Sequence, residues 1–365
     1  MIVLYFILLA PFLSGFFQEN QPVEKIQIDG PYVVYKNDLI YVQYIYQEGG
    51  IKSVTTDSFP VSQKKNIELR VATDEPGKYF TVKLKNRLSN EKSEFGKPAK
   101  LLAISDIEAN FKALRTLLQV NGVIDQEFNW TYGKGEVVFT GDFFDRGSQQ
   151  NEVLWLMYAL EEKAREAKGY VHFVLGNHEI MNMNGDFRYV HPRYMEHAKM
   201  MGVPYISFYW DNTELGRWLR TKNIAQRIGD ILFVHGGIST PVNYMNVPAP
   251  AINELARPFY PDTTYNYPDI WTEILFSDLG PFWYRGYYSK KSPATSGQVD
   301  TTLNVFGVKY ITTGHTVVAD TISVLYNGRV FNTDVYHAGG NSEAMLVEGG
   351  KFYRVNSKGE KFLMK

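Results

Sequence analysis

The sequence predicts a layered α/β domain that is preceded by a small all-β domain, because the residue pattern changes near residue 98. Between residues 19 and 97, short runs alternate β-branched or aromatic residues with polar ones and are separated by turn signals such as Asp-Gly and Glu-Gly-Gly. Over residues 98–365, apolar runs of four to six residues alternate with segments of helical periodicity. Short apolar strands that alternate with helices are typical of a sheet covered by helices.

The N-terminal pattern is interpreted as a small β-sandwich. Its strands are expected at residues 25–30, 31–36, 39–47, 66–73 and 78–86. The region from residue 19 to residue 97 contains no histidine and its acidic residues are scattered, so we expect a packing or docking module rather than a catalytic one. The polar segment 89–100 is expected to be a linker.

In the second domain, amphipathic helices are expected at residues 109–120 and 151–167. Strands are expected at residues 100–105, 136–140, 170–175, 231–236 and 309–314. In α/β folds of this kind, chemistry gathers at the carboxyl ends of the strands.

The amino-acid composition limits which binding partners and which cellular compartment the protein can have. The chain has 38 Lys and Arg against 39 Asp and Glu, so no charge excess favours nucleic acid as a partner. The apolar residues 1–18 are broken by Pro11 and Gly15, which indicates an export signal, without stable membrane insertion once the signal is removed. An uncleaved anchor or a buried first strand is the alternative. We therefore expect a periplasmic or extracellular protein; because cysteine is absent, packing must stabilise it and thiolate chemistry is excluded.

Each of the five apolar runs in the second domain ends in a residue that can bind a metal ion. These endings are Asp106 and Glu108, then GDFFDRG at 141–147, GNHE at 176–179, VHGG at 234–237 and GHT at 314–316. A single histidine after a strand is more often structural than a ligand, but five such endings indicate a shared site. The neighbouring glycines let the backbone turn sharply and approach an ion or a phosphate.

Together these runs resemble the motifs of the metallophosphoesterase (calcineurin-like) superfamily. GNHEIMNMNGDFRYV at 176–190 and PFWYRGY at 281–287 are similar to the Shewanella-like branch of the phosphoprotein phosphatases. The resemblance covers roughly residues 99–340 and implies a layered αββα domain at 98–365. It does not extend to the β-rich N-terminal part.

The resemblance implies a binuclear metal site in which a metal-bridging hydroxide is the nucleophile. Its implied ligands are Asp106, Glu108 and Asp142 for one ion and Asp142, Asn177, His235 and His315 for the other. The physical reasoning agrees, because a shared carboxylate can hold two ions about 3.5–4 Å apart around a phosphoryl group.

The same motifs suggest the groups that would handle the proton and the phosphate. His178 is expected to be the general acid for the leaving group, oriented by Asp145. The guanidinium of Arg146 suits a tetrahedral phosphate, and Arg188 and Arg285 are weaker candidates for the same role because either could be a surface pair.

Glu108 departs from the family pattern, which usually has histidine at this position. One interpretation is that a metal site has been lost. The other is that a third carboxylate gives the site more oxygen ligands and so a preference for hard cations. On the second interpretation, we predict that the two ions are Mn²⁺ or Mg²⁺. Iron or Ca²⁺ are alternatives, and a di-zinc centre is disfavoured. The added negative charge should also raise the pKa of the bridging water.

The predicted function is hydrolysis of phosphate monoesters, on phosphorylated Ser, Thr or Tyr in peptides or on small substrates. A phosphodiesterase or nucleotidase on the same core, or a non-catalytic metal-stabilised binding protein, is the alternative. The aromatic segment 259–288 is either a loop cluster with its own small core or a wall that grips the substrate. The remaining histidines, His172, His191, His197 and His337, are expected to be structural, with His337 near enough to support a ligand.

Overall fold

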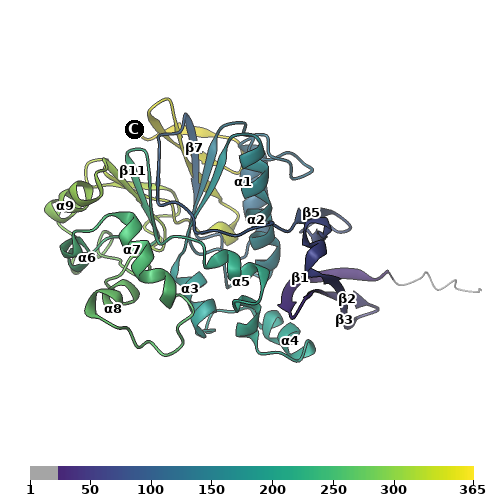
Figure 1. Ribbon diagram of the computed structural model, residues 1–365. Coiled ribbons are helices and arrows are strands. Elements are labelled where there is room, and N and C mark those ends of the chain that lie inside the picture. The colour runs from purple at the N-terminus through teal and green to yellow at the C-terminus, as the bar shows by residue number, and fades with distance from the viewer. Residues whose placement is uncertain (1–23) are drawn as a thin grey trace, which may run out of the picture.

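Two six-stranded sheets pack face to face in the computed structural model, which describes residues 24–365 (Figure 1). The predicted export signal at residues 1–18 lies outside the described residues. The first sheet has the order β17-β16-β15-β7-β8-β9. Its strands are β7 (Lys100–Ile104), β8 (Glu136–Thr140), β9 (Tyr170–Val174), β15 (Glu343–Glu348), β16 (Lys351–Asn356) and β17 (Lys361–Leu363).

The second sheet has the order β13-β14-β12-β11-β10-β6. Its strands are β6 (Glu94–Phe95), β10 (Ala225–Ile228), β11 (Ile231–Val234), β12 (Tyr310–Thr313), β13 (Ser323–Leu325) and β14 (Val330–Asn332). The strand β6 lies inside the segment predicted to be a linker, and it pairs in parallel with β10. The linker prediction was therefore wrong at this point, because two residues of backbone pairing leave no periodicity in the sequence.

Burial on both faces explains the nearly continuous apolar runs of the central strands. In β7, Leu101 and Ala103 belong to the core between the two sheets. Leu102 and Ile104 alternate with them and belong to the core under the helices. Because side chains of a strand alternate between faces, a strand covered on both sides must be apolar throughout.

Helices cover the outer faces of both sheets and complete the αββα layering that was expected (Figure 1). The helices α1 (Phe111–Val120) and α2 (Gln150–Glu166) lie on the first sheet, and α7 (Ala249–Ala256) packs on β10 of the second. The other helices are α3 (Asn177–Asn184), α4 (Pro192–Met200), α5 (Glu214–Leu219), α6 (Thr240–Met245), α8 (Ile270–Phe276) and α9 (Ser296–Phe306).

The N-terminal region forms an antiparallel sheet of β1 (Ile26–Lys36), β2 (Leu39–Glu48) and β3 (Ile51–Pro60), followed by a hairpin of β4 (Glu68–Ala72) and β5 (Tyr79–Lys83). The strand β3 was not predicted, because most of its side chains are exposed and it lacks a hydrophobic face. The two strands expected at 25–36 are one strand, β1, with an irregularity around Asp29.

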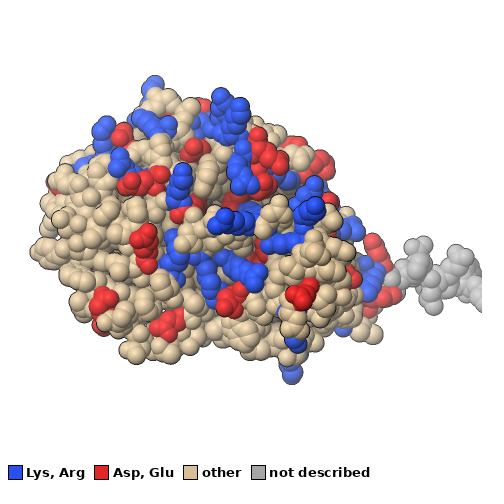
Figure 2. Space-filling view, viewed as in Figure 1, with Lys and Arg blue, Asp and Glu red and all other residues tan. Residues whose placement is uncertain are grey.

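The N-terminal sheet packs beside α2, α4 and α5, and the hydrophobic core continues across this junction (Figure 1). Trp155 of α2 is fully buried and donates a hydrogen bond from Nε1 to the carbonyl oxygen of Pro31, at 2.9 Å. Among residues 24–365, no helix combines the length and apolar character needed to cross a membrane. Figure 2 shows Lys and Arg side chains with Asp and Glu among them on one face, in keeping with the net charge of −1.

Candidate metal centre

The polar strand ends predicted from the sequence meet at one edge of the two sheets. The strands β7, β8 and β9 are parallel neighbours, as are β11, β12 and β14, so their carboxyl ends lie at a common edge within each sheet. Hydrogen bonds join the two edges: Nδ1 of His235 lies 2.8 Å from the carbonyl oxygen of Thr140, and the backbone N–H of His315 donates to the Asp106 carboxylate at 3.1 Å.

The backbone at this edge is held in a conformation that L-residues seldom adopt. Seven of the fourteen non-glycine residues that have a positive φ among the described residues belong to these loops. They are Asp106, Glu108, Ala109, Asp142, Asp145, Arg146 and His315. Left-handed residues of this kind tend to cluster where a functional arrangement is imposed on the backbone.

Two of the motif glycines are required for close approach rather than for a turn. A Cβ atom at Gly176 would lie 2.3 Å from an oxygen of Asp142, and one at Gly314 would lie 2.2 Å from an oxygen of Asp106. Any side chain at these positions would displace a carboxylate that belongs to the candidate site.

Asp142, His235 and His315 form the centre of the site, with ligand atoms that all lie within 4.8 Å of one another. Oδ2 of Asp142 is 3.0 Å from Nε2 of His235, and Oδ1 of Asn177 is 3.1 Å from the same nitrogen. Because Nδ1 of His235 faces a carbonyl oxygen, a neutral ring would carry its proton there and present the lone pair of Nε2 to this group. The donor set therefore fits a divalent cation.

His315 is oriented in the same manner. Its Nε2 lies 3.2 Å from the carbonyl oxygen of Trp283, which leaves Nδ1 as the atom with a lone pair in the neutral ring. Burial lowers the pKa of His315 to about 2, and the neighbouring His235 lowers it further toward the neutral form. For His235, burial would lower the pKa, but the Asp142 carboxylate raises it to about 9.

His178 and Asp145 form a buried pair beside this centre. Nδ1 of His178 lies 2.6 Å from Oδ2 of Asp145, and Nε2 of His178 lies 3.7 Å from Oδ2 of Asp142. The amide of Asn182, one turn further along α3, donates to Oδ1 of Asp145 at 2.9 Å and so fixes that carboxylate. Burial would lower the pKa of His178, but Asp142 and Asp145 raise it above its ordinary value.

The three predicted arginines lie in different places. Arg285 donates to the carbonyl oxygen of His315 at 2.5 Å and to Oγ1 of Thr316 at 2.8 Å, so it is anchored at the rim of the centre. Arg146 forms an ion pair with Glu108. Arg188 is 63% exposed and is paired with Asp186, so of the three it is the weakest candidate for binding phosphate.

Glu108 lies at the rim rather than in the central group. Its carboxylate is directed to Arg146, and its side chain is 20% exposed. Asp106, in contrast, is 4% exposed and accepts the backbone N–H of His315 with both carboxylate oxygens, each at 3.1 Å.

The remaining histidines have protein partners. Nε2 of His337 lies 3.0 Å from the carbonyl oxygen of Ser105, directly behind Asp106. His172 contacts Glu136 of the neighbouring strand at 2.8 Å. His191 caps α4, and His197 pairs with Asp29 of β1. None of the four reaches the centre formed by Asp142, His235 and His315.

Two buried carboxylates of the site were not singled out from the sequence. Glu179 accepts the backbone N–H groups of Gly176, Asp142 and Phe143 at 2.6, 2.9 and 2.7 Å, and thereby ties two motif loops together. A Glu at the third position of a helix is a capping signal that could have pointed to it. Asp334 follows β14 and is 6% exposed; the short strand before it gives little periodicity.

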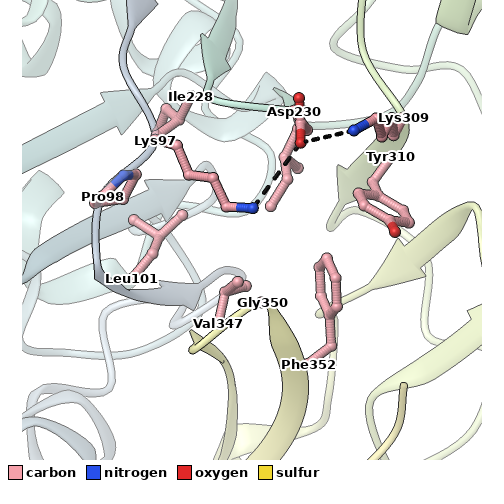
Figure 3. Close-up of a pocket in the computed structure, with 11 residues that line it drawn as sticks. Lys97, Pro98, Leu101, Ile228, Asp230, Lys309, Tyr310, Val347, Gly350 and Phe352 are labelled. Atoms are coloured by element: carbon pink, nitrogen blue, oxygen red, sulfur yellow. Dashed lines mark hydrogen bonds and ion pairs between the residues drawn. The ribbon is translucent and has the colours of Figure 1, made fainter.

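The opposite edge of the same two sheets has a different character. A cavity of about 140 Å³ opens there between the sheets (Figure 3). Its walls include Leu101, Val347 and Phe352, and Lys97 and Lys309 at its rim both face Asp230, at 4.0 and 3.3 Å. The charged groups at this edge are thus exposed and paired.

Comparison with known proteins agrees with this geometry. Residues 99–319 match the family model described as calcineurin-like phosphoesterase. The structure of the cold-active protein-tyrosine phosphatase of a psychrophile Shewanella sp. superposes with a TM-score of 0.83 and 34% identity, over 92% of this chain and 99% of that chain.

Two curated relatives are Shewanella-like protein phosphatases. Shewanella-like protein phosphatase 2 of Arabidopsis thaliana is 38% identical over 104 residues, 28% of this chain. Shewanella-like protein phosphatase 1 of Plasmodium berghei is 25% identical over 229 residues, 60% of this chain. These matches cover 27% and 61% of the relatives' own length. Because this family model matches more than half of the chain, the chain belongs to the calcineurin-like phosphoesterase family.

Proposed function

We propose that the protein is a divalent-metal-dependent phosphatase that hydrolyses phosphate monoesters on phosphorylated peptides or proteins. The observation that supports this most directly is the arrangement of a histidine–carboxylate pair next to a metal-ligand group: Nε2 of His178 lies 3.7 Å from Oδ2 of Asp142, which in turn lies 3.0 Å from Nε2 of His235. The phosphatases among the similar proteins support the same reaction class.

The metal ions would be held by the oxygen and imidazole ligands at the sheet edge. We propose a pair of ions, with Asp142 shared between them. The ligands are Asp106, Glu108 and Asp142 for one ion, and Asp142, Asn177, His235 and His315 for the other. When bound, such a pair polarises a phosphoryl group and makes water a stronger nucleophile at neutral pH.

The protein's own residues would handle the proton and the charge. Asp145 accepts the Nδ1 proton of His178, so Nε2 of the protonated ring is directed toward the central group and can give its proton to the departing oxygen. Arg285 is held at the rim by the His315 carbonyl, where its remaining donors can bind phosphate oxygens. Arg146 could do the same once Glu108 releases it. Arg188 is the weakest candidate because it is exposed and paired.

The substrate class is argued from the aromatic side chains at the rim. The ring of Tyr189 lies 5.1 Å from the ring of His178 and is 42% exposed, and Trp283 lies edge-on to His315 at 5.8 Å. An aryl phosphate could pack its ring against such a wall. We therefore propose phosphotyrosine peptides ahead of phosphoserine or phosphothreonine peptides, in line with the tyrosine phosphatase of Shewanella sp..

The decisive experiment combines metal analysis with turnover. The purified protein is stripped of metal and assayed with added Mn²⁺, Mg²⁺, Ca²⁺ or Zn²⁺ against phosphotyrosine, phosphoserine and phosphothreonine peptides, nucleotides and a bis-aryl phosphodiester. We expect turnover of the monoesters with Mn²⁺ or Mg²⁺. Preference for the diester or the nucleotides would favour the alternative enzyme classes, and no turnover with any metal would favour a binding protein.

The metal preference has a test at Glu108. Replacing this carboxylate by an imidazole removes one negative charge and one hard ligand, so Glu108→His should shift the preference from Mn²⁺ or Mg²⁺ toward Zn²⁺. The acidic limb of the pH–rate profile, where the bridging water loses its proton, should also move to lower pH. If both stay unchanged, Glu108 is not a metal ligand and its pairing with Arg146 is its role.

Export to the periplasm or the cell exterior is part of the proposal. It depends on residues 1–18.

A further inference from the structure

Asp334 lies at the same edge as the predicted ligands, one strand beyond the last of them. The strands β12 and β14 are parallel, and Thr313 is paired with Asn332. His315 and Asp334 each come two residues after these paired positions. Both strands end at these paired residues, so Asp334 and His315 follow their strands at the same edge of the sheet.

The backbone around Asp334 is fastened to both halves of the candidate site. Oγ1 of Thr333 lies 2.9 Å from Oγ of Ser105, and the backbone N–H of Thr333 donates to the Thr313 carbonyl at 2.8 Å. The Asn332 amide donates to the carbonyl oxygen of Thr316 at 2.9 Å. Asp334 is therefore held between the segment that carries Asp106 and the segment that carries His315.

The carboxylate of Asp334 has no hydrogen-bond donor and no ion-pair partner among the residues that the structure describes, although the residue is only 6% exposed. The backbone N–H of Asp334 is satisfied by Oδ1 of Asn332, at 3.1 Å, so the unpartnered group is the carboxylate itself. A buried carboxylate without partners is unfavourable unless it takes up a proton or a cation compensates it.

The charges that face Asp334 come from three segments, which carry Asp106, then Asp142 and Arg146, and Arg285. Burial and the Asp142 carboxylate raise the pKa of Asp334 to about 7, while Arg285 and Arg146 act in the opposite direction. Burial and then Asp334 raise the pKa of Asp106, and Asp334 has a larger effect there than Asp142 has. Both arginines already have oxygen partners, so the shortage of positive charge lies between Asp106 and Asp334.

We propose that Asp334 is a further metal ligand, which binds the same cation as Asp106. This inference rests on the proposed function. Three carboxylates, from Asp106, Asp142 and Asp334, then surround one ion, and such an oxygen-rich set suits Mn²⁺ or Mg²⁺ better than Zn²⁺. Glu108 joins these three carboxylates when it releases Arg146 for phosphate, as the proposed function requires.

The test measures metal binding directly by calorimetric titration with Mn²⁺ and by metal analysis after desalting. The wild type should bind two equivalents. Asp334→Asn should lose one equivalent or bind it more than about 100-fold more weakly, because the loss of a group that only supports a ligand already costs about 10- to 100-fold. Asp334→Glu, which keeps a carboxylate, should retain two. Asp300→Asn, which changes a surface carboxylate paired with Arg329, serves as the matched control and should bind like the wild type.

Thermal unfolding adds a measurement that does not depend on activity. Without metal, Asp334→Asn should unfold at the wild-type temperature or above it, because a repulsion with Asp106 is removed. With Mn²⁺, its stabilisation should be smaller than that of the wild type. If Asp334→Asn binds two equivalents with wild-type affinity, the inference is wrong, even if KM rises. If the wild type binds no metal and hydrolyses no phosphate ester, both the inference and the proposed function are wrong.

Discussion

Two buried, charged regions of this protein differ in how their charges are balanced. At the junction between the N-terminal sheet and α4, the carboxylate of Asp29 accepts hydrogen bonds from Tyr32 at 2.6 Å, from Asn151 at 2.7 Å and from the backbone N–H of Gly30 at 2.7 Å. It is also in hydrogen-bond contact with Nδ1 of His197, and both side chains are fully buried. Every oxygen of this carboxylate is therefore compensated by groups of the protein itself.

The candidate metal centre is balanced only in part. Asp142 has His235 and His178 as neighbours, and burial works against the lowering of its pKa that these two rings cause. Among residues 24–365, Asp106 has the backbone N–H of His315 and the Ser105 hydroxyl as hydrogen-bonding neighbours, and the Asp334 carboxylate has no donor. Burial is similar in the two regions, but the carboxylate of Asp29 is fully partnered by the protein, whereas that of Asp334 is not.

The difference separates a structural network from a functional site. Complete pairing stabilises one arrangement of side chains, whereas an incomplete set of partners leaves room for a cation. Burial of charge does not by itself indicate function; the charge that the protein leaves uncompensated does.

The largest effect should follow from Asp142→Asn, because the shared carboxylate contacts both proposed ion positions. We expect kcat/KM to fall by about 10³-fold or more, with the protein still folded. Steady-state assays in saturating Mn²⁺ and circular dichroism measure the two quantities. Asp300→Asn is the matched surface control, and near-normal activity of Asp142→Asn would contradict the assigned centre.

The corresponding change at the junction should act on stability instead. Asp29→Asn leaves His197 without its buried partner, so the free energy of unfolding should fall by about 3 kcal/mol. Metal stoichiometry and affinity should stay at wild-type values. Chemical denaturation and calorimetry measure these, with the exposed Asp57→Asn of β3 as control. A loss of metal binding without a loss of stability would reverse the comparison.

A smaller effect is expected from His178→Gln, which keeps the central ligands and removes the proposed acid. We expect kcat to fall by about 10²-fold with aryl phosphates, because one proton-transfer group is lost. Metal content should be unchanged. His191→Gln, in the segment that leads into α4, should keep kcat near the wild-type value. An unchanged kcat in His178→Gln would show that another group supplies the proton.

The smallest effect is a dependence of the free energy of unfolding on pH, which comes from the buried Glu152 at the junction. Burial and the Asp29 carboxylate raise the pKa of Glu152 from 4.5 to about 8. Between these values the folded protein holds a proton that the unfolded chain has released, so the free energy of unfolding should decrease as pH rises from about 4.5 to 8.

Glu152→Gln should reduce this decrease, since an amide does not titrate. Denaturant unfolding of both proteins at pH 5, 6.5 and 8 measures the slopes, with Glu162→Gln, a half-exposed position on the same helix, as control. Equal slopes for Glu152→Gln and the wild type would show that Glu152 is ionised in both states.

The layered α/β fold and the motif segments of the site could be predicted from the residues alone. Continuous apolar strands report burial on both faces, and polar residues after such strands report the carboxyl edge of a sheet, so both signals are local. The polar edge strand β3 and the two-residue strand β6 were not predicted, because neither has a hydrophobic pattern.

The balance of charge was decided only by the tertiary structure. Three features depend on which loops the two sheets bring together: Glu108 is directed to Arg146, Arg188 pairs with Asp186, and Asp334 raises the pKa of Asp106. Sequence spacing gives the kind of group at each strand end. Whether that group is already compensated depends on neighbours from distant parts of the chain, and only packing brings those neighbours within reach.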